Sequence, residues 1–188
     1  MTMTFNTLLL LVLGGVFANN YALEKFLGVT PLLGASKTEG KALRLGAAVA
    51  VVILLTSALA WPVQTYLLAP LSLDYLQTLV FAALILIVVY LVELLAKAAH
   101  LSLGVYFPLI ALNSAVLGAA VNSMGAGYTF LETLLSSLGV GLGFLFALLI
   151  FSGVQTRIDQ PHVPKAFRGL PVSLLAACIV SMVLVAFK

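Results

Sequence analysis

Charged residues are scarce in this sequence of 188 residues. Nine lysines and arginines and six aspartates and glutamates make up only 8% of the chain, whereas a soluble globular domain is about 25% charged. Such a chain cannot cover a water-facing surface, which excludes a soluble enzyme and a nucleic-acid-binding domain. Its one cysteine, Cys178, excludes an internal disulfide. Its two histidines, His100 and His162, are too isolated in the sequence to indicate a metal site.

Apolar residues, by contrast, make up 63% of the chain, and the mean hydropathy is +1.21. A spanning helix needs about 20 mostly apolar residues. The sequence therefore predicts an all-α membrane protein whose six transmembrane helices lie at approximately 4–27, 43–66, 72–96, 102–122, 131–156 and 170–187. The connections are short, so residues 1–188 are expected to form a single membrane domain.

Lysine and arginine residues occupy alternate connections between these segments. The connections after the first, third and fifth segments carry seven basic residues: Lys37, Lys41, Arg44, Lys97, Arg157, Lys165 and Arg168. The connections after the second and fourth segments carry none. Because basic loops stay in the cytoplasm, this pattern predicts cytoplasmic basic loops and both termini outside. The alternation also supports the number of six segments.

Polar and helix-breaking residues interrupt the first segment at membrane depth. They include the amides Asn19 and Asn20, the charged pair Glu24–Lys25, and a Thr-Pro step at Thr30. Such residues are costly in a membrane unless protein buries them or they face a cavity. This stretch is therefore expected to be a broken, functional segment. Lys25 either extends to the cytoplasmic interface or forms an ion or proton gate or a contact with a partner subunit.

Six segments divide into two sets of three, approximately 1–97 and 98–188. With an odd number in each half, the halves must be inverted if they are structural repeats. A weak similarity supports this, because Asn20 and Asn113 each precede an apolar run of small residues with a glycine. We therefore expect two inverted three-helix repeats with broken helices 1 and 4. The amides either hydrogen-bond the backbone groups freed at the breaks or coordinate a cation.

The remaining polar residues indicate structural roles. Glu93 and Lys97, spaced i, i+4, predict an ion pair at a helix end, and Asp74 and Glu132 suit helix N-termini. Three alternate glycines in the fifth segment predict one small-residue face for close helix contact: Gly139, Gly141 and Gly143. The sequence contains no nucleophile–base pair, no Cys or His cluster and no phosphate loop, so no catalytic site of its own is expected.

Three strings resemble one known family along essentially the whole chain: FANNYALEKFLGVTPLLGASK, YFPLIALNSAVLGAA and FSGVQTRIDQPHVPKAFRGLPVSLLAA. They are similar to the A subunit of the Rnf electron-transport complex and the E subunit of the sodium-pumping NADH:quinone oxidoreductase. The resemblance implies a multi-pass subunit of the cell inner (plasma) membrane in an ion-translocating ferredoxin:NAD oxidoreductase. It also implies a homologous E-type partner of opposite orientation, further subunits of B, C, D and G types, and an intramembrane [2Fe-2S] cluster shared with that partner.

The sequence departs from the family at the cluster. The family has a cysteine before the proline of the first motif and another after the asparagine of the second, and Thr30 and Ser114 stand there. Clusters are held by thiolates, and a hydroxyl is a poor substitute. The cluster is absent, is bound mainly by the partner's thiolates, or was lost in a divergent paralogue; we expect an absent or altered cluster. Asn19, Asn20, Lys25 and Asn113 would support the broken helices or line an ion path. The alternatives are a non-redox inverted-repeat transporter and a purely structural subunit.

Overall fold

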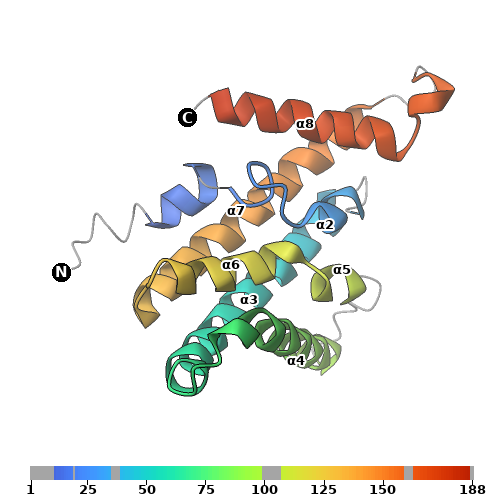
Figure 1. The fold of residues 1–188 in the computed structure, drawn as a ribbon. Coiled ribbons are helices and arrows are strands. Elements are labelled where there is room, and N and C mark those ends of the chain that lie inside the picture. The colour runs from blue at the N-terminus through green and yellow to red at the C-terminus, as the bar shows by residue number, and fades with distance from the viewer. Residues whose placement is uncertain (1–10, 19, 35–38, 99–106, 159–162, 187–188) are drawn as a thin grey trace.

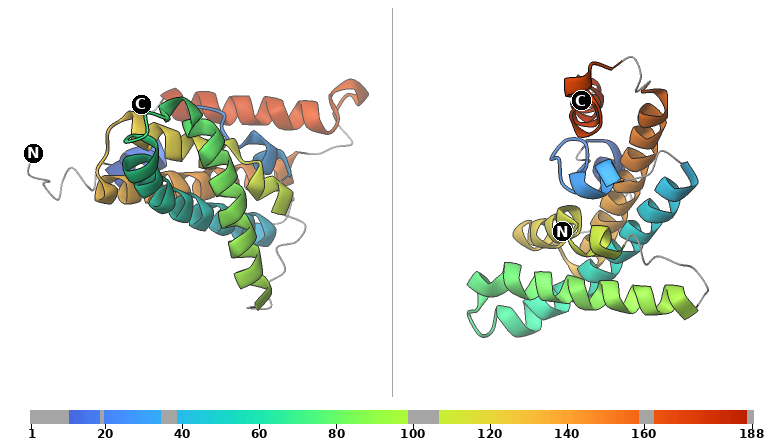
Figure 2. Two further views of the ribbon diagram at one scale, coloured as in Figure 1. Left: turned by 60° about the horizontal axis from the view of Figure 1, so that its bottom comes forward. Right: turned by 90° about the vertical axis from the view of Figure 1, so that its right-hand side faces the viewer.

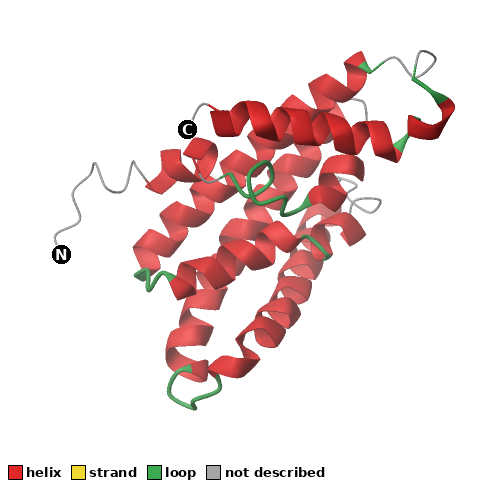
Figure 3. Ribbon diagram, turned by 45° about the horizontal axis from the view of Figure 1, so that its top comes forward, coloured by secondary structure: helices red, strands yellow, loops and turns green. Residues whose placement is uncertain are grey.

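The computed structural model describes residues 11–18, 20–34, 39–98, 107–158 and 163–186. These residues form helices joined by loops and turns, and no strand occurs among them (Figure 3). The prediction of an all-helical chain is therefore confirmed for this part of the sequence. The histidines His100 and His162, and the amide Asn19, lie outside the described residues.

Four helical stretches are long and apolar enough to cross a membrane: Ala42–Leu68, Asp74–Ala98, Pro108–Gly125 and Phe130–Arg157. They are built from α3 (Glu39–Pro62) with the π-helical η2 (Val63–Leu68), η3 (Asp74–Leu76) with α4 (Gln77–Ala98), α5 (Phe107–Ala111) with α6 (Ser114–Gly125), and α7 (Phe130–Arg157). The last helix, α8 (Leu170–Ala186), follows the short η5 (Lys165–Phe167) and contributes a shorter apolar stretch, Leu170–Val183. A chain with several such helices is a multi-pass membrane protein.

Two helical segments are interrupted. The N-terminal helix closes with the π-helical η1 (Gly14–Ala18), residues 20–28 form turns, and the short α2 (Val29–Gly34) follows. The second interruption separates α5 from α6 at residues 112–113. Each interruption leaves backbone N–H and C=O groups without a helical partner, and these groups need other partners where no water is present.

The centre of the molecule is an antiparallel pair formed by α3 and α7. A Cβ atom on Gly46 would lie 3.2 Å from the Cα of Leu145, and a Cβ on Gly141 would lie 3.1 Å from the Cα of Ala50. Small residues thus let the two backbones approach closely at both points. Figure 1 shows α4 and α8 at opposite edges of this pair, with α6 and the N-terminal segment between them, and the right-hand view of Figure 2 shows the same order.

The glycines of α7 serve two faces, so the prediction of a single small-residue face is wrong. A Cβ on Gly139 would lie 2.7 Å from the Val12 carbonyl oxygen, and one on Gly143 would lie 2.5 Å from the Gly15 carbonyl oxygen. Gly141 faces α3 instead. The reason is the helical period: residues four apart share a face, whereas residues two apart point about 200° from each other.

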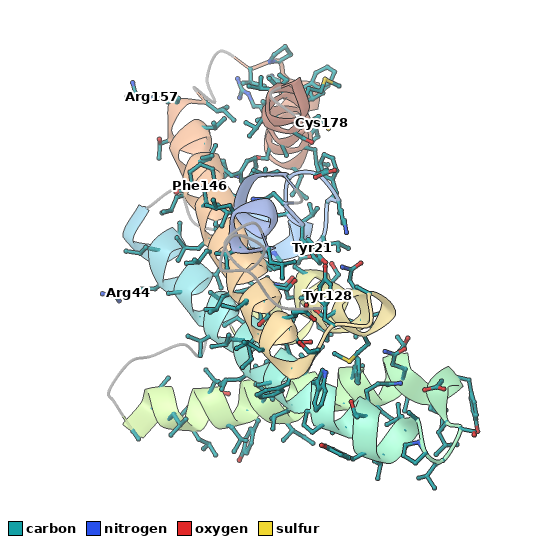
Figure 4. The ribbon with its side chains drawn as sticks, turned by 90° about the vertical axis from the view of Figure 1, so that its left-hand side faces the viewer. Tyr21, Arg44, Tyr128, Phe146, Arg157 and Cys178 are labelled. Atoms are coloured by element: carbon teal, nitrogen blue, oxygen red, sulfur yellow. The ribbon has the colours of Figure 1, made fainter. Side chains whose placement is uncertain are left out.

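The two ends of the bundle differ in chemistry. Figure 4 shows Arg44 and Arg157 at one side of the molecule, far from Tyr128. At the other end, Trp61 packs edge-on against Tyr66 and Phe130 with ring centroids 6.1 and 5.5 Å apart. Tryptophan and tyrosine gather where a membrane meets water, so this aromatic cluster marks one interface.

Two structural roles expected from the sequence are confirmed at helix ends. The Lys97 ammonium lies 2.8 Å from the Glu93 carboxylate. Glu132 accepts hydrogen bonds from the backbone N–H and the hydroxyl of Thr129, completing a capping box at the start of α7. Asp74 lies in the first turn of η3 and accepts a hydrogen bond of 2.7 Å from Gln64.

Candidate functional site

The two interruptions meet inside the molecule. The backbone N–H of Gly28 donates a hydrogen bond of 2.9 Å to the hydroxyl of Ser114, the first residue of α6. Gly28 has a φ of +75°, and a Cβ there would lie 2.6 Å from the Asn113 side-chain oxygen and 2.5 Å from the Phe144 ring. Glycine is therefore needed here for both conformation and space. This contact joins the stretch that leads into Thr30 to the start of α6.

Asn20 supports the first interruption with its whole side chain. Its amide nitrogen donates to the carbonyl oxygens of Val16 (3.0 Å) and Gly143 (2.9 Å), and its oxygen accepts from the backbone N–H groups of Ala22 (3.0 Å) and Leu23 (3.2 Å). The residue is 3% exposed. An asparagine amide has two donor hydrogens and two acceptor lone pairs, so Asn20 has no lone pair left for a cation.

Asn113 supports the second interruption in a related way. Its side-chain oxygen accepts from the backbone N–H of Ala115 at 2.9 Å and caps α6. The residue is 2% exposed, and its amide nitrogen has no hydrogen-bond partner within the described part of the chain. Both buried amides thus accept from the N–H two residues ahead, but only Asn20 also uses its donor hydrogens.

Thr30 and Ser114 are both exposed on the isolated chain, although the Gly28 contact brings their two stretches together. Their hydroxyls do not fit a [2Fe-2S] cluster, because clusters of this kind are held by thiolates. Nowhere among the described residues do three or more His, Cys, Asp or Glu side chains lie close enough together to hold a metal ion. Cys178 lies on α8 and is exposed. Thr30 and Ser114 themselves therefore do not supply ordinary cluster ligands.

Lys25 lies toward the α6–α7 connection and not toward the basic ends of α3 and α7. Its ammonium lies 4.3 Å from the centroid of the Tyr21 ring. Both residues line a cavity with Asn122 and Tyr128, and Figure 4 shows the two labelled tyrosines, Tyr21 and Tyr128, close to each other. The interpretation of Lys25 as a side chain extending to the basic interface is therefore not supported by this geometry.

Several contacts at the site involve residues that sequence reasoning missed. The Ser181 hydroxyl of α8 donates to the Leu23 carbonyl oxygen across 158 residues of sequence. The Gly143 carbonyl and the Phe144 ring contact the first interruption from the middle of α7. A backbone carbonyl occurs in every residue and a serine in an apolar helix is common, so no local sequence signal identifies these partners.

These features define a class: a polytopic helical membrane protein with two interrupted segments that contact each other and whose breaks are supported by buried amides. A family model described as "Rnf-Nqr subunit, membrane protein" matches residues 8–188. The chain belongs to this Rnf-Nqr family of membrane proteins.

Curated relatives match over nearly their full length. The chain is 40% identical over 186 residues to the A subunit of the Na(+)-translocating ferredoxin:NAD(+) oxidoreductase complex of Acetobacterium woodii, covering 97% of each chain. It is 39% identical to the A subunit of the ion-translocating oxidoreductase complex of Syntrophotalea carbinolica, covering 96% of this chain and 95% of the relative. For the protein of the same name from Serratia proteamaculans the identity is 37%, with 95% of each chain covered.

Proposed function

We propose that the chain is the A-type membrane subunit of an ion-translocating ferredoxin:NAD oxidoreductase complex. The observation that carries the proposal is the contact between Gly28 and Ser114, which joins two of the family-like motifs. Nearly full-length similarity to proteins named as the A subunit of such complexes supports it. The chain would contribute scaffold and path to the complex rather than a catalytic site of its own.

In this proposal the chain forms six spanning segments in two inverted halves, approximately 1–97 and 98–188. The contacts between segments support this arrangement, because each type of contact that α3 or α4 makes has a counterpart made by α7 or α8. Compared as whole segments, α3 packs against α4 and the fourth segment (α5 and α6), and α7 packs against α8 and the first segment (through η1). Likewise α4 contacts α6, and α8 contacts α2. The basic loops would lie in the cytoplasm of a cell with this inner-membrane complex, and both termini outside.

The intramembrane cluster site is altered or lost in this proposal. Thr30 and Ser114 occupy the positions that are cysteines in the family, and neither hydroxyl supplies a thiolate. No electron-transfer step is therefore assigned to this chain's residues. Because both hydroxyls are exposed on the isolated chain, we infer that a homologous E-type subunit of opposite orientation covers them. B-, C-, D- and G-type subunits would complete the complex.

The proposal is tested by purifying a tagged chain from membranes and analysing what accompanies it. We expect flavin-containing and E-type subunits to co-purify, without iron and EPR signals attributable to a cluster at this chain. Recovery of the chain alone, with ion flux in liposomes that needs no electron donor, would instead identify a non-redox transporter, the alternative favoured by the two hydroxyls.

The site itself is tested by Thr30→Cys combined with Ser114→Cys. If the partner supplies the remaining thiolates, reconstitution of the complex with iron and sulfide should add the iron and EPR signal of one [2Fe-2S] cluster. Thr65→Cys combined with Thr78→Cys is the matched control, because both threonines are exposed and lie outside the site. An equal iron gain in the control, or none in the site variant, would contradict the inferred geometry.

A further inference from the structure

A second polar feature lies between the midpoint of α7 and the α6–α7 connection. It is a cavity of about 270 Å³ whose polar lining consists of Tyr21, Lys25, Asn122, Tyr128 and Ser136. The side chain of Asn122 hydrogen-bonds to Tyr21. Pockets for drug-sized ligands measure about 300–1,000 Å³, so this cavity suits a small polar group.

Lys25 is the one charged side chain among the described residues that line the cavity. The ring of Tyr21 lies 4.3 Å from its ammonium, and a neutral ring compensates only part of a full positive charge. Lys25 is exposed on the isolated chain, and no described residue of the cavity lining carries a negative charge. The cavity therefore lacks a negative charge that would match Lys25.

Three carboxylates lie either next to Lys25 in the sequence or at this end of the fold, and each already has an interaction. Asp74 accepts a hydrogen bond from Gln64 at 2.7 Å, Glu132 caps α7 through Thr129, and Glu24 has a partner of its own. None of the three lines the cavity. A matching negative charge would then come from a molecule that enters the cavity.

The position of the cavity indicates the chemistry of that molecule. Tyr128 lines the cavity, and its carbonyl oxygen accepts a hydrogen bond of 3.0 Å from the Trp61 ring N–H. Trp61 belongs to the aromatic cluster that marks one membrane interface, where lipid headgroups lie. The hydroxyls of two tyrosines and a serine, together with an ammonium, can donate hydrogen bonds to an oxyanion with several acceptor oxygens.

We propose that the cavity binds a phosphate-bearing anion, either the headgroup of an anionic phospholipid or free phosphate, with the Lys25 ammonium as its charged contact. The site is distinct from the Thr30–Ser114 region and does not depend on the function proposed above. Binding there would stabilise the packing of the turns of residues 20–28 against α6 and α7.

The test measures the thermal unfolding midpoint of the tagged, full-length chain after delipidation, purified with whatever subunits accompany it. One arm adds phosphatidylglycerol with phosphatidylcholine as the neutral control, and the other adds sodium phosphate with sodium chloride at equal ionic strength. A rise with phosphatidylglycerol alone identifies the lipid headgroup, and a rise with phosphate identifies the free anion as sufficient. No rise in either arm overturns the proposal.

Variants attribute the effect to the cavity. Lys25→Gln should weaken the apparent affinity about tenfold or more, because a charged hydrogen bond is lost, while Lys25→Arg should keep it. Arg44→Gln removes an exposed charge elsewhere and should behave as the parent chain. Should Lys25→Gln fail to assemble, Ser136→Leu fills the cavity, keeps the charge and should lose the same response. If Lys25→Gln or Ser136→Leu assembles and its unfolding midpoint still rises as much as that of the parent chain, the proposal is overturned.

Discussion

Replacing Asn20 by alanine should destabilise the chain more than the same change at Asn113. Both amides are buried, at 3% and 2% exposure, so the volume removed and the surface uncovered are nearly equal. They differ in their hydrogen bonds. Asn20 makes four, at 2.9–3.2 Å, whereas Asn113 has one to Ala115 at 2.9 Å and an amide nitrogen without a partner in the described part of the chain.

The magnitudes follow from these contacts. Hydrogen bonds inside membrane proteins contribute about 0.6 kcal/mol each on average and about 1.7 kcal/mol at most, so losing four should cost about 2–4 kcal/mol. Loss of the α6 cap at Asn113 should cost about 1 kcal/mol. We expect a difference of about 1–3 kcal/mol between Asn20→Ala and Asn113→Ala.

The assay is unfolding of the full-length chain in mixed micelles as the fraction of dodecyl sulfate rises, followed by circular dichroism. The fluorescence of the single tryptophan, Trp61, gives a second signal, which reports on the aromatic cluster at one end of the bundle. Asn20→Asp retains the shape of the side chain but, when ionised, has no donor for the Val16 and Gly143 carbonyls. It should be at least as damaging as Asn20→Ala. Equal costs at Asn20 and Asn113, or a larger cost at Asn113, would refute the hydrogen-bond reasoning.

Two further predictions concern packing and charge. Gly143→Ala should destabilise the chain by about 1–3 kcal/mol in the same assay, since the new methyl group meets the Gly15 backbone and overpacking costs this much. Gly153→Ala, with open space around it, should be neutral or stabilising; similar losses in both variants would contradict the close-contact argument. Glu93→Gln should change stability by less than about 1 kcal/mol, because solvent screens the Lys97 side chain, which is 63% exposed against 16% for Glu93, and an ion pair with an exposed partner contributes little. A decrease in the free energy of unfolding above about 2 kcal/mol would show that the Glu93–Lys97 pair is shielded from solvent.

The apolar spans could be predicted because length and hydropathy decide them. The expected segments 43–66, 72–96 and 131–156 correspond to Ala42–Leu68, Asp74–Ala98 and Phe130–Arg157 within a few residues at each end. The interruption near Asn20 could be placed because amides, glycine and proline are costly in a continuous membrane helix. In both cases a local property of the sequence determines the structure.

The partners of the interruptions could not be predicted. Asn20 donates to the Gly143 carbonyl, 123 residues away, and any carbonyl on that helix has the same chemistry. The two faces of the α7 glycines depend on which helices flank α7, and spacing alone does not say whether alternate glycines share a neighbour. The cavity around Lys25 likewise forms only when separate segments of the chain meet.

Under the function proposed above, the contact at Ser114 would explain how this scaffold keeps its fold with a hydroxyl in place of a thiol. Asn20 and Gly28 of the first half bond to Gly143 and Ser114 of the second half, and Ser181 bonds back to Leu23. Each half thus satisfies backbone groups of the other. At Ser114 the backbone requires only an acceptor for the Gly28 N–H, and both a hydroxyl oxygen and a cysteine sulfur can accept a hydrogen bond. Under that proposal the requirements of folding and of cluster ligation would separate at Ser114, and the fold would persist without a thiolate there.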